Sequence, residues 1–410
     1  MLADLTALAG AALLLALVPG TLYLLLLTLA ALLPARAPRK ARQLAGTTPP
    51  HIAIVIPAHD EGAVISATLD ALRQAVANDP LAHVVVVADN CTDDTAALAR
   101  AHGVTVLERH DDALRGKGHA LHHAFSALTG KPADGARVPD WFVVIDADSR
   151  LDPGFLPAMR HAIDAGADAL QCRYLGTDTP KPGARAALAQ VAWFGWNLVR
   201  PRGRSRLGLS AGILGNGFAL SLATLARVPY QAGSIVEDAE YHVRLLHAGL
   251  RVRWVEQATV RAEAPPDRCA AASQRARWTG GRLALLRTEL GPTLRAALLG
   301  RWRLADAAAD LLLPPLTLLV AAAAVLACWH TPAVALGARM VLAVVAMHVL
   351  AALWLGRAGR HHWLALLTLP AHLLWSFATL PLTLRAARSN AAWTRTARQP
   401  VHHPEIHHEQ

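Results

Sequence analysis

Residues 5–33 form an uninterrupted apolar run without a charged side chain. About 20 helical residues cross the hydrocarbon core of a bilayer, where every backbone polar group needs an internal hydrogen bond. A secretory signal would have a basic start and a shorter apolar core, whereas Asp4 is the one charged side chain before this run. The run therefore predicts a retained transmembrane helix, which Pro19-Gly20 is expected to kink.

Basic residues follow this run at once, at Arg36, Arg39, Lys40 and Arg42. Lys and Arg accumulate on the cytoplasmic side of membrane segments. We therefore expect the N-terminus outside, and the domain that follows in the cytoplasm.

Three further apolar segments occupy roughly residues 307–329, 333–355 and 363–384. Pro314-Pro315 and Pro370 predict broken or re-entrant helices, because irregular backbone at membrane depth must be covered by protein or face a cavity. Three full crossings would leave the basic, acid-free stretch 385–398 outside, although its charge is typical of a cytoplasmic segment. We therefore expect two or three spans and a cytoplasmic C-terminus.

The formal net charge of +10 does not indicate a nucleic-acid partner, because of where the charges lie. Basic residues flank the apolar segments and cluster over residues 282–303. Anionic lipid headgroups are the nearest partner there, at roughly 1 kcal/mol per basic residue. The four cysteines have no metal-ligand spacing and fit a reduced, cytoplasmic domain.

The middle of the chain alternates short apolar strands with helical stretches, which predicts a doubly wound α/β domain. The expected strands cover residues 52–56, 83–88, 104–107, 141–145 and 169–174, and the expected helices cover 61–75, 93–101, 116–128, 153–164 and 240–248. The predicted organisation is an anchor (1–35), a basic linker (36–50), the α/β domain (51–290), a basic interfacial segment (291–306), a membrane region (307–385) and a polar tail (386–410).

Asp146-Ala147-Asp148 follows the apolar strand 141–145 directly. Ligands of open α/β sheets gather at the carboxyl ends of the strands, and Mg²⁺ is usually held by one or two carboxylates together with substrate phosphates. Alone, however, this pattern is more typical of a turn or a helix cap, because Asp binds nearby backbone.

Acidic residues also follow two other strands, in the stretches 57–62 and 89–94. Capping explains one or two of these residues, but like charges at one sheet edge repel each other unless a cation or a donor-rich ligand compensates them. Such clustering favours a functional site. A dinucleotide fingerprint and a phosphate-binding Walker loop are both absent from the sequence, and Gly116-Lys117-Gly118 lacks the spacing of the latter.

The order of six motifs resembles the family 2 glycosyltransferases with the GT-A fold, the nucleotide-diphospho-sugar transferase fold. Among these, the chain is similar to membrane-bound bacterial exopolysaccharide enzymes related to cellulose, hyaluronan and poly-N-acetylglucosamine synthases. The motifs are Pro57-Ala-His-Asp60-Glu61, Asp89-Asn-Cys-Thr-Asp93, Gly116-Lys117-Gly118, Asp146-Ala-Asp148, Glu237-Asp238 and Gln274-Arg-Ala-Arg277-Trp278, within about residues 51–290.

The resemblance implies an inverting hexosyltransferase of the bacterial inner membrane with a cytoplasmic active site. It implies a nucleotide-sugar donor, most simply a UDP-sugar, Mg²⁺ or Mn²⁺ as cofactor, and a lipid-linked saccharide or growing polysaccharide as acceptor. Polysaccharide-assembly membrane proteins are conceivable partners. The implied site residues are Asp238 with Glu237 for catalysis; Pro57, Asp60, Glu61, Asp89, Lys117, Asp146 and Arg277 for the donor; Gly215, Asn216, Gly217, Gln274 and Trp278 for the acceptor; and Asp148 with Asp146 for the metal.

Within this set the roles divide by chemistry. A departing nucleoside diphosphate needs a metal and a cation, and an attacking hydroxyl needs a carboxylate base. The resemblance places Asp148 on the metal, Asp146 toward the ribose, Asp238 as base and Arg277 near the diphosphate. The alternative, purely structural roles are an acidic first turn of a helix at Glu237-Asp238 and an amphipathic interfacial helix around Gln274.

Two features separate this chain from the polymer synthases. Val236 precedes Glu237, where those enzymes often have Thr, and the membrane part is small for a chain-conducting pore. These features favour transfer of single sugars, while the Gln-Arg-Ala-Arg-Trp motif favours a processive synthase. A non-catalytic membrane component of an export complex is the third alternative.

Overall fold

The computed structural model describes residues 2–35, 49–77, 79–130, 137–177, 183–231, 233–262 and 268–378. Most of the predicted basic linker and the whole polar tail lie outside these ranges. The predicted side of the C-terminus lies outside them as well.

The described residues form a sheet with the strand order β3-β2-β1-β4-β7-β6-β8-β5. The first four strands in this order are mutually parallel, β7 runs antiparallel to both of its neighbours, and β5 runs antiparallel to β8. The bounds are β1 Ile52–Ala58, β2 Ala82–Asp89, β3 Thr105–Arg109, β4 Trp141–Val144, β5 Ser149–Leu151, β6 Ala169–Gly176, β7 Phe218–Ser221 and β8 Val252–Ala262.

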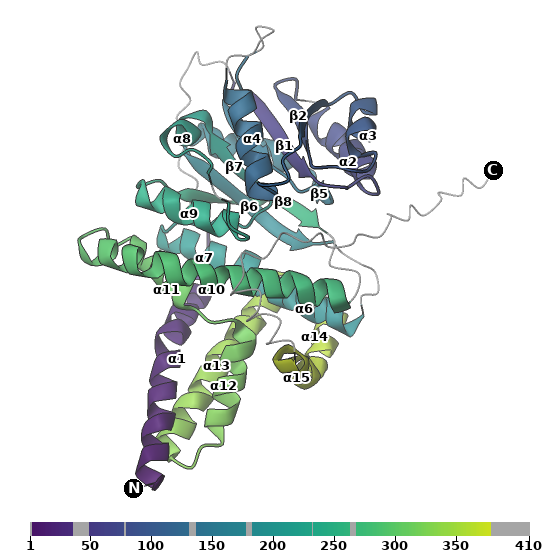
Figure 1. The fold of residues 1–410 in the computed structure, drawn as a ribbon. Coiled ribbons are helices and arrows are strands. Elements are labelled where there is room, and N and C mark those ends of the chain that lie inside the picture. The colour runs from purple at the N-terminus through teal and green to yellow at the C-terminus, as the bar shows by residue number, and fades with distance from the viewer. Residues whose placement is uncertain are drawn as a thin grey trace, which may run out of the picture.

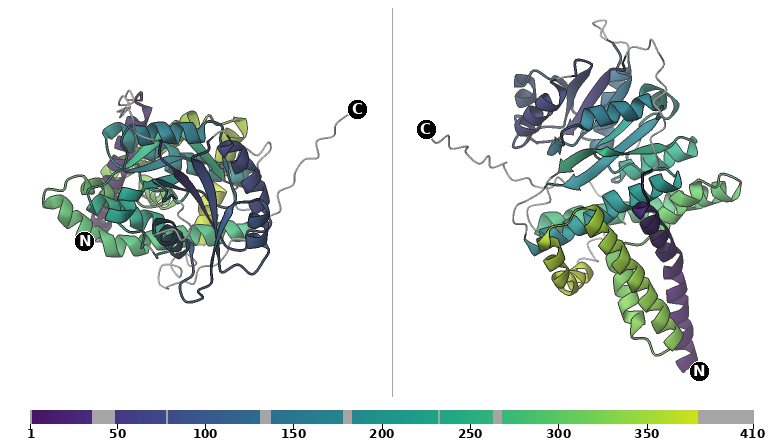
Figure 2. Two further views of the ribbon diagram at one scale, coloured as in Figure 1. Left: turned by 90° about the horizontal axis from the view of Figure 1, so that it is seen from above. Right: turned by 180° about the vertical axis from the view of Figure 1, so that it is seen from behind.

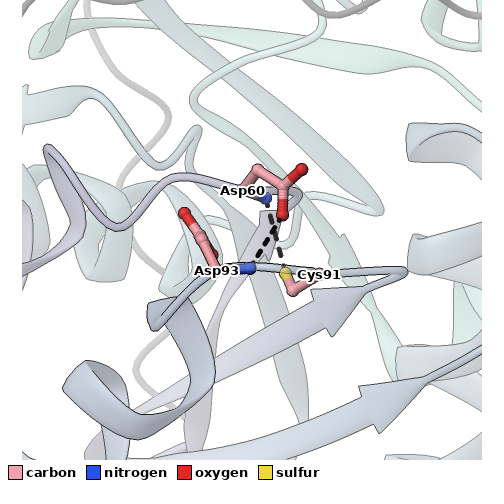
Figure 3. A group of neighbouring side chains, drawn as sticks. All are labelled: Asp60, Cys91 and Asp93. Carbon is pink, nitrogen blue, oxygen red and sulfur yellow. Dashed lines mark hydrogen bonds between the residues drawn. The ribbon is translucent and has the colours of Figure 1, made fainter.

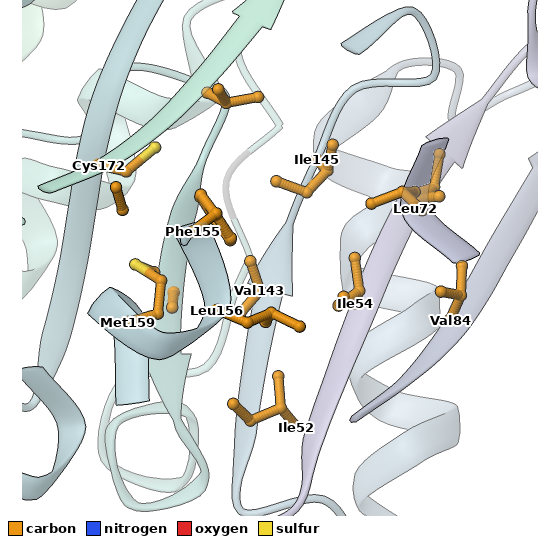
Figure 4. Packing of buried hydrophobic residues seen from close by; sticks show 14 of the residues in the cluster. Ile52, Ile54, Leu72, Val84, Val143, Ile145, Phe155, Leu156, Met159 and Cys172 are labelled. Atoms are coloured by element: carbon orange, nitrogen blue, oxygen red, sulfur yellow. The ribbon is translucent and has the colours of Figure 1, made fainter. Parts of the chain in front are cut away.

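Helices cover both faces of this sheet, as Figure 1 shows. One core joins the strands to α2 (Ile65–Val76) and α5 (Phe155–Asp164), and the other joins them to α4 (Lys117–Thr129) and α9 (Glu237–His247). Alternate residues of β1 point to opposite cores, with Ile54 in the first and Val55 in the second. Figure 4 shows the first core, where Phe155 and Met159 of α5 pack toward Val143. The central strands are thus buried on both sides, which explains their unbroken apolar sequences.

The α/β prediction is confirmed, but the sheet is mixed and not wholly parallel. Strands β5, β7 and β8 were not predicted, because β5 and β7 are short and the hydrophobic pattern loses its regularity after Gly176. Strand β1 continues through Pro57 to Ala58 beside β2, at a point where its pairing with β4 has already ended. Helices α2 and α3 (Thr95–Ala101) begin later than predicted, because the residues before them form the turns described below.

Among the described residues, two helices are long and apolar enough to cross a membrane: α1 (Leu2–Leu32), over Asp4–Leu32, and α13 (Pro332–Leu355). The helices α11 (Leu304–Leu312) and α12 (Leu316–Ala327) form a pair bent by 63° at Pro314-Pro315, as a broken span or a re-entrant loop would be. Helix α1 continues through Pro19. These helices share a core of their own, which includes Leu24, Leu319 and Val341.

The last predicted membrane segment, residues 363–384, does not form one long helix in its described part. It is divided between α14 (Arg360–Ala365), a 3₁₀ turn (Leu366–Thr368) and α15 (Leu369–Ala378), with the remainder outside the described residues. Helix α15 begins directly before Pro370, and proline suits the first turn of a helix but not its interior.

A layer of helices separates the α/β domain from the apolar helices (Figures 1 and 2). It contains the long α10 (Arg268–Leu298) and a continuous helical stretch made of α6 (Ala184–Phe194), a π-helical turn (Gly195–Val199) and α7 (Arg200–Leu207). The remaining helix, α8 (Leu222–Arg227), follows β7. Helix α7 packs tightly on α1, since a Cβ at Gly203 would lie 2.2 Å from the backbone oxygen of Leu27.

Candidate active site

The carboxylate of Asp146 lies at the end of β4, against the first residue of α4. Lys117 Nζ donates a hydrogen bond to Asp146 Oδ1 and a second one, 2.5 Å long, to the backbone oxygen of Gly215. Although burial opposes its charged form, the carboxylate of Asp146 raises the pKa of Lys117. Three segments far apart in the sequence thus meet at one ammonium group.

Asn216 connects the loop before β7 with the strand ends. Its side-chain oxygen accepts a hydrogen bond from the Asp146 N–H (3.2 Å), and its amide donates to Ser149 Oγ (2.7 Å). Its backbone oxygen accepts from the Gln171 side chain at 2.8 Å. Asn216 is fully buried, so its amide holds the end of β4 and does not face an acceptor.

The glycines on both sides of Asn216 have left-handed backbones, with φ of 81° at Gly215 and 69° at Gly217. A Cβ at Gly217 would lie 2.2 Å from Cys172 Sγ, so this position requires glycine for packing. A Cβ at Gly215 would lie 3.2 Å from Asp238 Oδ2. Gly215 therefore marks the place where the loop meets the predicted base.

Glu237 and Asp238 begin α9, where the helix dipole favours acidic side chains. Burial raises the pKa of Glu237, and the neighbouring charge of Asp238 raises it further, while Lys117 opposes the change. Burial likewise raises the pKa of Asp238, against the N–H of Ala239 and the charges of Lys117 and Arg282. Two carboxylates with raised pKa values beside a lysine are typical of a functional site, and not of a simple helix start.

Asp148 lies two residues beyond Asp146 and is half-buried, with Ser149 Oγ 3.4 Å from its Oδ1. Since Lys117 holds Asp146, Asp148 is the better placed of the two to bind a cation directly. Two carboxylates are too few to enclose Mg²⁺ or Mn²⁺ alone, but they suit an ion whose other ligands are diphosphate oxygens. The donor set therefore fits the predicted metal.

The loops after β1 and β2 are tied together by acidic side chains, as Figure 3 shows. Asp60, whose φ is 51°, accepts hydrogen bonds from the N–H groups of Thr92 (2.6 Å) and Asp93 (3.3 Å). Asp93 in turn accepts from the N–H groups of Gly62 (2.9 Å) and Thr95 (3.0 Å). Ligand atoms of Asp60, Cys91 and Asp93 lie within 4.8 Å of one another, as they would in a metal site. The hydrogen bonds to backbone N–H groups explain this cluster without a metal, because they join the two loops.

Asp89 ends β2 in a buried position and pairs with Arg109 of β3 at 2.6 Å. Glu61 is buried as well, and its N–H donates to Thr95 Oγ1 at 2.8 Å. Of the predicted donor-site residues, Pro57 and Asp89 therefore lie at the ends of β1 and β2, and Asp60 and Glu61 lie on the loop after β1. The side chains of Asp60 and Asp89 carry structural contacts that the sequence did not reveal.

The Gln274 motif lies near the start of α10. Trp278 is 48% exposed, while Gln274 and Arg277 are half-buried. Burial lowers the pKa of Arg277, and the nearby charge of Glu237 opposes this effect, so Arg277 lies within electrostatic range of the carboxylate pair. The chain thus brings Arg277 toward Glu237 across a long stretch of sequence.

Two residues near this cluster were not predicted from the sequence. Tyr174 of β6 forms a side-chain hydrogen bond with Asn216 and packs edge-on against Trp193, with ring centroids 5.0 Å apart. Arg282 of α10 lies close enough to Asp238 for each charge to act on the other's pKa. A sequence signal existed for Arg282, which follows the Gln-Arg-Ala-Arg-Trp motif on the same helix.

Comparison with known proteins identifies the family. The sequence profile described as "Glycosyltransferase like family 2" matches residues 49–281, which is more than half of the chain. The chain belongs to this family. It is therefore a glycosyltransferase, as the sequence motifs predicted. The family match covers β1 to β8 and the start of α10, including every predicted site residue.

Curated relatives cover a smaller part of the family 2 enzyme. Protein RfbJ of Shigella flexneri is 29% identical over 109 residues, which are 27% of this chain and 73% of RfbJ. An uncharacterized glycosyltransferase of Mycobacterium tuberculosis is 32% identical over 117 residues, which are 28% of this chain and 45% of the relative. The match thus spans less than half the length of the mycobacterial relative.

Among solved structures, the mannosyltransferase PcManGT from Pyrobaculum calidifontis, in complex with GDP-Man and Mn²⁺, is similar with a TM-score of 0.53. The alignment covers 84% of this chain and 97% of PcManGT, at 20% identity. At this identity the similarity concerns the fold, which is that of a GT-A glycosyltransferase.

Proposed function

We propose that this family 2 enzyme is an integral membrane glycosyltransferase of the bacterial inner membrane. It transfers a hexose, with inversion, from a nucleotide-sugar, most simply a UDP-sugar, to a lipid-linked saccharide or a growing exopolysaccharide. Its active site faces the cytoplasm, and Mg²⁺ or Mn²⁺ is its cofactor.

One observation carries this proposal: Asp238, Gly215, Lys117 and Asp146 form one continuous cluster at the end of β4. A purely structural role does not require a carboxylate base next to a candidate metal site. In a sugar transfer they serve the two ends of a single displacement, the attacking hydroxyl and the departing diphosphate.

On the donor side, Asp148, with Asp146 beside it, would hold the metal, which would supply a positive charge against the departing diphosphate. Arg277 adds a cation from α10, near Glu237. Lys117 keeps Asp146 oriented through the hydrogen bond to its Oδ1. Pro57, Asp60, Glu61 and Asp89, at the ends of β1 and β2 and on the loop after β1, form the nucleoside side of the pocket. Figure 3 shows how Asp60 joins this loop to the one after β2.

On the acceptor side, Asp238 takes the proton of the attacking hydroxyl. Burial raises its pKa, which makes it a stronger base than an ordinary aspartate. Glu237, the preceding residue, is a second carboxylate, and the charge of Asp238 acts on it. Gly215 leaves room beside Asp238, and the exposed ring of Trp278 offers a flat apolar face to a sugar, with Gln274 on the same helix.

The membrane location rests on α1, α13 and the bent α11–α12 pair, which lie together on one side of the α/β domain (Figure 2). The basic residues after α1 favour a cytoplasmic domain. An acceptor held at the bilayer surface would approach from the side of α10, which carries Gln274 and Trp278.

The test uses purified full-length protein with labelled UDP-sugars and a membrane lipid extract as acceptor. We expect transfer that requires Mg²⁺ or Mn²⁺, is lost in Asp148→Ala, and is lost in Asp238→Asn with donor binding intact. Near wild-type transfer by Asp238→Asn would show that another group is the base. Absence of transfer or hydrolysis with every common nucleotide-sugar would favour a non-catalytic role in an export complex.

A processive synthase is the second candidate, since the Gln274 motif lies on a helix between the active site and the membrane helices. The length of the labelled product separates the two: one added sugar per acceptor supports single transfer, and long chains support a synthase.

A further inference from the structure

A buried group of charged side chains lies on the membrane side of Asp238. It contains Arg200 and Arg204 of α7, Arg282 of α10, and Asp306 and Asp310 of α11. Arg200 and Arg204 both pair with Asp310, and Arg282 donates to the Asp310 backbone oxygen at 2.7 Å. The Arg204 Nε lies 3.5 Å from Asp306 Oδ1. Three guanidinium groups thus share two carboxylates.

Trp196 brings two of these cations together. The guanidinium carbon of Arg200 lies 3.8 Å from the indole centroid, and that of Arg282 lies 4.5 Å from it. Trp196 belongs to the π-helical turn before α7, and such turns are frequent at functional sites. The indole is 36% exposed, so this side of the group is open.

The positive charge of this group is incompletely compensated. The side chain of Arg200 is 4% exposed, and its Nε is buried without a hydrogen-bond partner among the described residues. Burial lowers the pKa of Arg282 to about 10, and the charge of Arg204 contributes to this shift. Buried cations are costly unless an anion or a full set of acceptors offsets them.

The depth of the group indicates where a compensating anion comes from. About 20 helical residues cross the hydrocarbon core of a bilayer. Counted from Asp4, this length of α1 ends at Tyr23. The Tyr23 hydroxyl donates to Asp306 at 2.6 Å and accepts from Arg204 at 2.8 Å. With Asp4 at the opposite membrane surface, the group is therefore placed at the level of the lipid headgroups, while Asp146 and Asp148 lie beyond Asp238 in the α/β domain.

We propose that Arg200, Arg282 and Trp196 bind the phosphate of a membrane lipid, and that this lipid carries the acceptor to Asp238. The inference rests on the proposed function and names its acceptor class as a phosphate-bearing lipid. Arg282 joins the two sites, since it contacts Asp310 on one side and lies near Asp238 on the other. The phosphate supplies the missing anion, and its position brings the lipid headgroup to the base.

The experiment compares the apparent Tm of the full chain in phosphatidylcholine nanodiscs that contain either phosphatidic acid, which has an exposed phosphate monoester, or diacylglycerol, which has none. We expect phosphatidic acid to raise the Tm of the wild type by about 2–4 °C. The increase should disappear in Arg200→Gln and persist in Arg295→Gln, which removes an exposed charge from α10. Equal increases in both variants would overturn the proposal.

A second variant and a control with free phosphate complete the experiment. The double variant Arg200→Gln/Asp310→Asn removes one cation and one carboxylate, so it leaves the net charge of the group unchanged and provides a second variant if Arg200→Gln folds poorly. Each protein is compared with its own diacylglycerol baseline. Inorganic phosphate added to diacylglycerol nanodiscs should have no effect; an increase equal to that with phosphatidic acid would identify free phosphate as the ligand and overturn the lipid source.

Donor hydrolysis separates this inference from the proposed function. Arg200→Gln should keep metal-dependent hydrolysis of the nucleotide-sugar while it loses the response to phosphatidic acid. A wild type that responds to phosphatidic acid but binds no nucleotide-sugar would contradict the proposed function alone. A raised donor KM in Arg200→Gln with an intact lipid response would place Arg200 on the donor and overturn the lipid site.

Discussion

Lys117 Nζ donates hydrogen bonds to Asp146 Oδ1 and to the backbone oxygen of Gly215, so one cation joins the end of β4 to the loop before β7. Its charge also opposes the raised pKa values of Glu237 and Asp238. Lys117 therefore positions the metal-site carboxylate through a hydrogen bond and favours the ionised form of the base.

Replacing this cation should change the pH dependence of catalysis. In Lys117→Met the pKa of Asp238 rises further, so the fall in kcat toward acid occurs at higher pH than in the wild type. We also expect kcat to fall about 100-fold, as when one preorganised electrostatic contact is lost. The measurement is a pH profile of kcat, with Lys117→Arg as the charge-conserving control. An unchanged acid limb in Lys117→Met would contradict the electrostatic role.

Gly215→Ala should impair catalysis because its Cβ would crowd Asp238. Gly249 is a matched control: its φ of 76° is also left-handed, but no atom lies within 4 Å of its Cβ position. Both variants should lose about 1–2 kcal/mol of stability through backbone strain. Only Gly215→Ala should also lose about tenfold in kcat, through displacement of the base. Equal kcat values in the two variants would show that Asp238 tolerates the contact.

Glu237→Gln should be more stable than the wild type at alkaline pH. Because burial raises the pKa of Glu237, the native state binds more protons than the unfolded state between the ordinary and the raised pKa, and stability falls as pH rises through this window. The amide avoids this cost, so the difference in Tm should grow to roughly 2 °C above the window and vanish below the ordinary pKa of Glu.

The control for this measurement is Glu240→Gln on the same helix. It removes an i,i+4 pair with Arg244, so it should lower stability by about 0.3–0.5 kcal/mol. A difference between Glu237→Gln and the wild type that does not change with pH would contradict the proposed cost of the buried charge.

The proposed topology can be tested with native cysteines. Cys328 is exposed at the end of α12, and the neighbouring Trp329 donates to the Thr6 backbone oxygen, so it lies at the N-terminal end of α1. A membrane-impermeant maleimide should label Cys328 in intact spheroplasts, and Cys328→Ser should remove this label. Cys91 should react only after permeabilisation. Labelling of Cys91 in intact cells would reverse the proposed orientation.

The sequence predicted an element well where its apolar residues follow one clear pattern. The buried strand at residues 141–145 and the helix at 116–128 appear as β4 and α4 with bounds changed by one residue, because β4 is apolar on both of its buried faces and α4 packs on one core. It failed at β7 and β8, which lie in the region where the pattern becomes irregular. Pairing of β7 against β4 is a long-range event that no local propensity records.

The candidate site shows the same division. Asp146, Asp148, Asp238 and Arg277 were predicted from motif order alone. Asp60 and Asp89 were predicted only as donor-site residues, but Asp60 also clasps the neighbouring loop and Asp89 pairs with Arg109. Side-chain partners of this kind depend on which loops meet at the sheet edge, so the chemistry of a residue type cannot predict them.

The sequence by itself determined the family, the α/β class, the apolar helices and the residue types needed for sugar transfer, because these follow from periodicity, composition and motif order. The tertiary structure alone decided that Lys117 holds Asp146, that Gly215 adjoins Asp238, and that Arg282 lies between Asp238 and Asp310. Each of these contacts joins elements far apart in the chain. They form only when an antiparallel β7 brings its loop to β4 and when α10 crosses beneath the sheet.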